Sequence, residues 1–113
     1  MITVDTNILV RYAVKDDPQQ TLAATLFLDS NPCLVIPTVV LETAWVLGSK
    51  NGYGLERKIV AERIRHIPGL PNVQVAEGAA LASALDWYEA GMDIADALHL
   101  SLAGNRQGFA TLD

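Results

Sequence analysis

Four carboxylates stand at positions where the sequence pattern makes a negative charge informative. Asp5 and Asp113 each close a short apolar run that has the pattern of a strand. Glu42 lies in the apolar stretch "VVLETAW", and Asp96 lies near the start of the helical stretch "DIADALHLSLA". Because a buried carboxylate without a partner costs free energy, acids in such apolar surroundings indicate binding or catalysis.

Each acid also has a purely structural interpretation. Asp5 could cap a short helix that follows it, and Asp113 could be a solvated terminus. Glu42 could lie on a solvated helix face, although most of its neighbours within one helical turn are apolar. Asp93 is best interpreted as the N-cap of the helix that carries Asp96, so Asp96 is the better candidate ligand.

The elements that must position these acids alternate along the chain. The four predicted strands cover Ile2–Val4, Leu34–Ile36, Val73–Val75 and Phe109–Leu112, and helical pattern follows each of the first three. The predicted helices cover residues 8–12, 18–29, 38–47, 55–66, 78–90 and 94–104, with Asp17 as N-cap before Pro18. This alternation predicts an α/β fold, a three-layer sandwich with a central, mainly parallel sheet covered by helices on both faces.

The predicted sheet would bring the acids together at one edge. Ligands of a parallel α/β sheet bind at the carboxyl ends of the strands, where Asp5 and Asp113 are expected. The start of the last helix is expected to direct Asp96 to the same edge, and Glu42 completes the set. Neighbouring carboxylates repel one another unless cations compensate them. All-oxygen ligation favours Mg²⁺ or Mn²⁺ over Zn²⁺, because the single cysteine and the two histidines lack zinc-ligand spacing.

The composition is that of a single soluble domain, 1–113, with a continuous core. Membrane-spanning runs and signal-peptide features are lacking in the sequence, and the lone cysteine, Cys33, suits a reducing compartment, so a cytoplasmic protein is expected. The net charge of −5 argues against a polyanionic partner. However, residues 50–66 carry +3, from five basic and two acidic side chains, which softens that objection.

At this point the sequence resembles the PIN-domain nucleases, and within them the VapC-type toxins of type II toxin–antitoxin systems. The matching segments are "VDTNILVRY", "KDDP", "IPTVVLETAWVL", "YEAGMDIADALHLSLA" and "GFATLD", which follow the family in order along essentially the whole chain. By position, the resemblance implies that the metal-binding and catalytic residues are Asp5, Glu42, Asp96 and Asp113. Thr6 or Asn7 resembles the family's polar supporting position beside the first aspartate, and Asp93 is expected to support the site as the cap of the helix that carries Asp96.

The resemblance implies a metal-dependent endoribonuclease that acts on RNA, forms a homodimer and is held inactive by a cognate antitoxin protein. The residues expected to contact the RNA backbone are Arg11, Lys50, Arg57 and Lys58, with a solvated helix face as the alternative. Apolar helical surfaces around Trp45 and Trp87 favour the homodimer. The family pattern also predicts a last strand and often a short helix beyond Asp113, so the domain is expected to be truncated at its C-terminal end.

Two other classes of protein remain as alternatives. The first is a catalytically inactive PIN-like module that binds a protein partner. The second is a phosphoryl-transfer domain, because Asp5 follows the first strand as the nucleophilic aspartate of such domains does. Asn7, however, stands where a phosphatase would carry its second aspartate, and Val75 is followed by Ala76 and Glu77 where a receiver domain would carry its acceptor.

Overall fold

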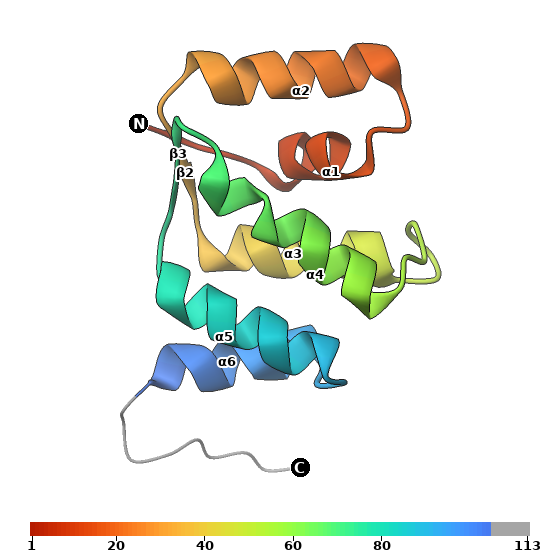
Figure 1. The fold of residues 1–113 in the computed structure, drawn as a ribbon, viewed down its shortest axis with the longest axis vertical. Coiled ribbons are helices and arrows are strands. Elements are labelled where there is room, and N and C mark those ends of the chain that lie inside the picture. Colours follow the sequence, from red (N-terminus) through yellow and green to blue (C-terminus); the bar gives the residue numbers. More distant parts are fainter. Residues whose placement is uncertain (105–113) are drawn as a thin grey trace.

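A computed structural model describes residues 1–104, which form three strands, six α-helices and one short 3-10 helix (Figure 1). The strands are β1 (Ile2–Thr3), β2 (Cys33–Val35) and β3 (Val73–Val75), and they form a parallel sheet in that order. In the register of the sheet, Cys33 of the central strand lies opposite both Ile2 and Val73. The predicted parallel pairing is therefore confirmed, while the fourth predicted strand, 109–112, lies outside the described residues.

Helices make up all the connections between the strands. From β1 to β2 the chain forms α1 (Thr6–Val14) and α2 (Pro18–Ser30), and from β2 to β3 it forms α3 (Pro37–Gly48) and α4 (Arg57–Arg65). The 3-10 turn η1 (Ile67–Gly69) leads into β3, and α5 (Gly78–Glu89) and α6 (Ile94–Ala103) follow it. The predicted α/β sandwich is confirmed, and each predicted helix is present with ends shifted by only a few residues.

Local sequence signals account for most of the helix ends. Asp17 caps α2 as predicted, because its side chain accepts hydrogen bonds from the backbone N–H groups of Gln19 and Gln20. Pro18 follows at the first helical position, where its missing N–H costs nothing. The regular part of α4 ends at Arg65, three residues before Pro68, and the chain tightens into η1.

The core lies between the central strand and the helices. Cys33 and Val35 of β2 are fully buried, as are the large side chains Leu9, Leu28, Leu47, Ile64 and Leu85, each from a different helix. Burial raises the pKa of the Cys33 thiol, whose side chain packs in the core as a small hydrophobe. None of the helices formed by residues 1–104 is long and apolar enough to cross a membrane.

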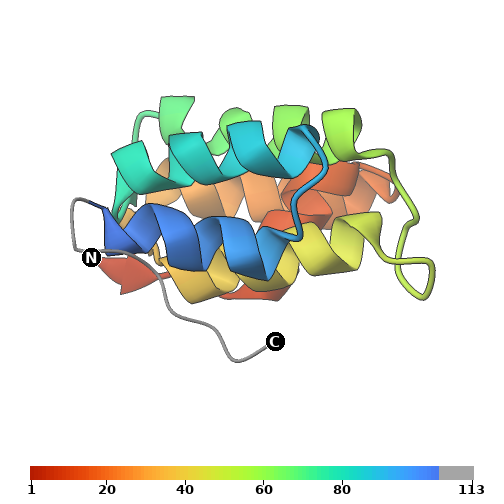
Figure 2. The ribbon, with the colours of Figure 1, turned by 90° about the horizontal axis from the view of Figure 1, so that it is seen from below.

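Three helix pairings position the predicted site residues. α3 packs against both α1 and α6, and α5 packs along α6. α5 and α6 run side by side in opposite directions, as both views of the ribbon show (Figures 1 and 2). The start of α6 lies beside the end of α3, because Asp93 and Ile94 line one small pocket together with Gly48 and Ser49.

Candidate active site

Asp5 follows the first strand and begins the first helix. Its Oδ1 atom accepts a hydrogen bond of 2.7 Å from the backbone N–H of Asn7, so the structural interpretation of Asp5 as an N-cap is confirmed. This bond does not exclude a second role, because a carboxylate has two oxygens with several lone pairs. Asp5 is exposed, and the predicted supporting residues Thr6 and Asn7 are the first two residues of the helix that it caps.

Glu42 lies midway along α3 and is exposed. The expectation that its apolar neighbours would enclose it is wrong. The buried side chains of α3 are Val39, Val40, Thr43, Ala44 and Leu47, which follow the helical period along one face. Glu42 and Trp45 are three residues apart on the opposite stripe, where Trp45 is 60% exposed. The apolar composition of this segment therefore reflects one buried face together with a separate exposed tryptophan.

At the start of α6, Asp93 takes the capping role that was expected for it. The Asp93 Oδ1 atom accepts hydrogen bonds from the backbone N–H groups of Ala95, at 2.9 Å, and of Asp96, at 3.3 Å. Asp93 is thus the N-cap, and the exposed carboxylate of Asp96 lies in the first turn.

The start of α6 lies in a different place from the one predicted. It was expected at the carboxyl edge of the strands, but it lies beside Gly48 and Ser49, at the end of α3. The physical reason is the antiparallel pairing of α5 and α6 (Figure 2). The twelve residues of α5 span about 18 Å, so the end of α5 lies that far from the start of α5 when the chain reverses direction into α6.

The structure thus distributes the three described acids over neighbouring helices. Asp5 begins α1, Glu42 lies on α3 and Asp96 begins α6, and α3 packs against the other two. Within residues 1–104, no group of three or more His, Cys, Asp or Glu side chains is close enough to hold a metal ion. The fourth predicted acid, Asp113, lies outside the described residues. The donor type fits a hard divalent cation, whereas the described carboxylates alone do not close a site around one.

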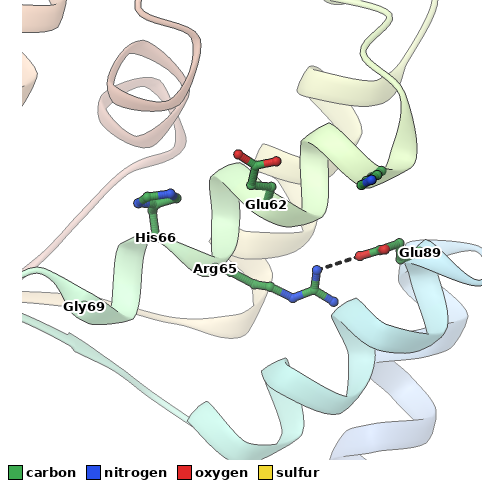
Figure 3. Close-up of a pocket in the computed structure, with 6 residues that line it drawn as sticks. Glu62, Arg65, His66, Gly69 and Glu89 are labelled. Carbon is green, nitrogen blue, oxygen red and sulfur yellow. Dashed lines mark hydrogen bonds and ion pairs between the residues drawn. The ribbon is translucent and has the colours of Figure 1, made fainter.

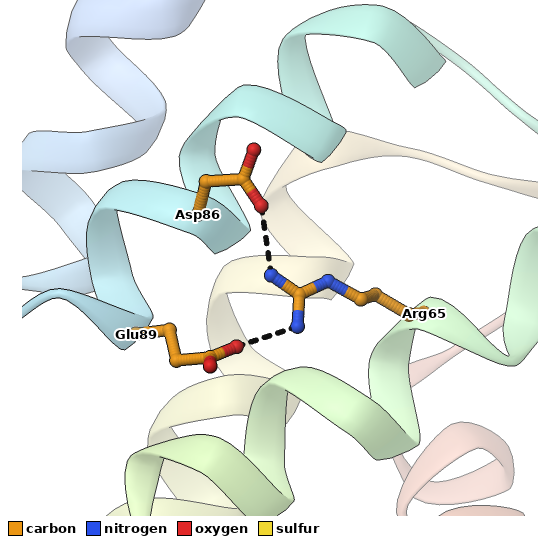
Figure 4. Close-up of polar contacts among 3 residues, drawn as sticks. All are labelled: Arg65, Asp86 and Glu89. Carbon is orange, nitrogen blue, oxygen red and sulfur yellow. Dashed lines mark hydrogen bonds and ion pairs between the residues drawn. The ribbon is translucent and has the colours of Figure 1, made fainter.

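The basic segment 50–66 is partly used by the fold itself. Arg65 forms ion pairs with Glu89 at 2.6 Å and with Asp86 at 2.9 Å (Figure 4). The pKa of the Arg65 guanidinium is raised chiefly by the hydrogen bond to Glu89. The charge of Glu89 and the hydrogen bond and charge of Asp86 raise it further. Arg63 donates to the backbone carbonyl of Ala13. These two arginines join α4 to α5 and α1.

Arg57, predicted as an RNA contact, is also bound within the fold. Its Nη1 atom donates to the carbonyl oxygens of Tyr88, at 2.8 Å, and Met92, at 2.7 Å. Its guanidinium carbon lies 4.7 Å from the centre of the Tyr88 ring. Sequence reasoning missed this role because the two carbonyl groups lie 31 and 35 residues further along the chain. No local pattern marks such contacts.

Two pockets lie near these charged side chains. One of about 450 Å³ lies between α4 and α5 and is lined by Lys58, Glu62, Arg65, His66, Gly69 and Glu89 (Figure 3). Its lining mixes both signs of charge and includes none of the predicted metal ligands. A smaller pocket, of about 190 Å³, is lined by Trp45, Arg57 and Tyr88 together with Asp93 at the start of α6. This smaller pocket borders the start of α6, which is an element of the predicted site.

The structure defines the class of fold as a parallel α/β sandwich, with acids after the first strand and on two later helices. The PIN domain family matches residues 2–113 of this sequence. The chain therefore belongs to the PIN domain family, whose members are generally nucleases that use divalent metal ions and bind RNA. Neither the curated proteins nor the solved structures give a match to this chain.

Proposed function

We propose that this protein is a metal-dependent endoribonuclease, the toxin of a toxin–antitoxin pair. The observation that carries the proposal is the placement of Asp5, Glu42 and Asp96, which are all exposed, on three helices packed side by side. Together with Asp113 they would hold Mg²⁺ or Mn²⁺. Exposed carboxylates can change rotamer at little cost, so binding of the cation itself could draw them together.

The proposed chemistry divides between the cation and the chain. A bound divalent cation would supply a polarised water and neutralise charge that develops on the leaving oxygen of a phosphodiester. The carboxylates would bind and orient that cation. Thr6 and Asn7 lie at the start of the helix that Asp5 caps, where they would orient its free oxygen. Asp93, as the cap of α6, would hold the first turn that carries Asp96.

The proposed partners follow from charge and exposed surface. RNA would follow the exposed basic side chains Arg11, Lys50 and Lys58 through its phosphates. A cognate antitoxin would place a basic side chain among the acids and so block cation and substrate together. A second copy of the chain would cover the exposed tryptophans, Trp45 and Trp87. Such a toxin would work in the cytoplasm, where its RNA substrates are.

The test is cleavage of a labelled structured RNA with Mg²⁺, with Mn²⁺ and with EDTA. We expect Asp5→Asn and Asp96→Asn each to lower the metal-dependent rate by about 100-fold or more, because each removes a charged ligand. Asparagine is as good an N-cap as aspartate, so Asp5→Asn should leave α1 intact. Asp29→Asn, an exposed acid near the end of α2, is the matched control and should cut at the wild-type rate.

Equal cutting by the wild type and both site variants would contradict the proposal and point to a contaminating ribonuclease. Cutting that persists in EDTA would contradict the metal requirement. Circular dichroism of each variant establishes that a lost rate does not reflect a lost fold.

One observation favours a second candidate, a catalytically inactive PIN-like module that binds a protein partner. This observation is the lack of a closed metal-binding group among residues 1–104. A Mn²⁺ titration distinguishes the two candidates. If the protein is an inactive module, the wild type should bind Mn²⁺ no more tightly than the Asp96→Asn variant does. Saturable binding by the wild type, weakened by Asp5→Asn and Asp96→Asn, would favour the nuclease.

A further inference from the structure

One side chain donates hydrogen bonds to both ends of the connection between α5 and α6. Arg57, the first residue of α4, donates from Nη1 to the carbonyl of Tyr88, in the last turn of α5. The same atom donates to the carbonyl of Met92, the residue before the α6 cap, Asp93. The guanidinium group also stacks over the buried Tyr88 ring. The side chain thus bridges the two carbonyls that flank the turn.

The backbone hydrogen bonds of the turn are local, although the Met92 side chain packs against the core. The backbone N–H of Gly91 donates to Tyr88, and that of Met92 donates to Trp87, so both bonds stay within the turn and α5. Gly91 has a φ of +121°, which glycine adopts more readily than other residues. Arg57 of α4 adds a hydrogen bond to the Met92 carbonyl from another helix, and Arg65 of the same helix pairs with Glu89 just before the turn. Arg57 therefore links α4 by a hydrogen bond to the residue that precedes the α6 cap.

We propose that Arg57 is a positioning residue for the start of α6, and through it for the carboxylate of Asp96. The sequence of contacts runs from Arg57 to the Met92 carbonyl, then to the Asp93 side chain, which holds the backbone N–H of Asp96. Release of the Met92 carbonyl frees the cap and lets the first turn of α6 shift. The consequence for metal binding rests on the proposed function, whereas the consequence for the start of α6 does not.

The chemistry of arginine suits this position better than that of lysine. A cation near the C-terminus of α5 interacts favourably with the helix dipole. The planar guanidinium group can stack on an aromatic ring while it donates at its edge, which a lysine ammonium group cannot reproduce. Charge-assisted hydrogen bonds of this kind are stronger than neutral ones, so their loss has a measurable local effect.

The experiment compares Arg57→Gln and Arg57→Lys with the wild type, and uses Arg65→Gln as the matched control. Arg65 lies on the same helix and also contacts α5, but its partners, Asp86 and Glu89, precede the turn (Figure 4). The first readout is amide hydrogen exchange at residues 95–97, with amides of α2 as the global reference. The second readout is the dissociation constant for Mn²⁺ alone, measured by titration.

We expect Arg57→Gln to lower exchange protection at residues 95–97 by at least about tenfold, with α2 unchanged. It should also weaken Mn²⁺ binding by about 10-fold or more, as loss of groups that orient metal ligands does. Arg57→Lys should fall between Arg57→Gln and the wild type in both measurements. Arg65→Gln should change neither of them.

Unchanged protection at residues 95–97 in both Arg57 variants would overturn the inference. So would an equal loss at residues 95–97 and in α2, because that is the result of a general loss of stability. If Arg57→Gln does not fold, the same criteria apply to Arg57→Lys. If the wild type does not bind Mn²⁺, the proposed nuclease function fails, and hydrogen exchange alone decides whether Arg57 positions α6.

Discussion

Asp5 illustrates how one side chain can serve both the fold and the proposed chemistry. One of its oxygens holds the Asn7 N–H and begins α1, which leaves the other oxygen available for a cation. The substitution chosen at this position therefore decides what an experiment measures. Alanine would remove cap and charge together and cost about 1 kcal/mol of stability, whereas asparagine removes the charge alone.

Tyr88 offers a prediction for alkaline pH. Burial raises the pKa of its hydroxyl group, and the nearby charge of Arg57 opposes this only in part. The unfolded chain therefore loses this proton first, at about pH 10, so the free energy of unfolding should fall as pH rises above that value. Denaturant titrations between pH 8 and about 11 should show a steeper fall for the wild type than for Tyr88→Phe. Tyr53→Phe, which changes an exposed tyrosine, is the control; equal slopes for all three proteins would contradict the prediction.

At the scale of elements, the loop between α3 and α4 packs closely against the end of α3. The backbone N–H of Tyr53 donates to the carbonyl of Val46, and that of Leu55 donates to Leu47. A Cβ atom on Gly52 would lie 2.0 Å from the Val46 carbonyl oxygen, closer than any side chain could tolerate. The lack of a side chain at Gly52 thus lets this loop fold back on the helix.

We expect Gly52→Ala to lower the free energy of unfolding by about 1–3 kcal/mol, because the loop must move away from Val46. Gly69→Ala is the matched control, since a Cβ atom there meets nothing within 4 Å. Urea denaturation of both variants measures the difference. A Gly52→Ala protein as stable as Gly69→Ala would show that the loop does not need this close approach.

At the scale of the whole molecule, the exposed tryptophans are the surface that most needs explanation. Trp45 is 60% exposed on α3 and Trp87 is 37% exposed on α5. Large aromatic side chains are enriched in protein interfaces, which supports the proposed homodimer. Leu22 of α2 is exposed to a similar extent, 59%, but it lies on a different helix from either tryptophan.

Light scattering at micromolar concentration should therefore give twice the monomer mass of 12.2 kDa. Trp45→Glu should shift the mass toward that of the monomer, because it places a charge in the proposed interface. Leu22→Glu introduces the same charge on α2 and should leave the dimer intact. A monomeric wild type, or equal dissociation by both variants, would reject this interface.

Much of the fold could be predicted from local signals. The Asp17 and Asp93 caps and the alternation of short apolar runs with helical periods all act over a few residues. They are therefore visible in the sequence itself. Asp5, Glu42 and Asp96 could be selected as candidates for a similar reason, since a charge in apolar or strand-end surroundings is a local anomaly.

The sequence by itself determined the order of elements, the parallel sheet and the types of ligand available for a cation. Only the tertiary structure decided that Glu42 is exposed, that the start of α6 lies beside the end of α3, and that Arg57 holds the turn before it. The physical reason is the distance along the chain over which each interaction acts. Caps and periodicity are set by residues within one or two turns, whereas helix direction and the partners of a guanidinium group depend on packing between segments more than 30 residues apart.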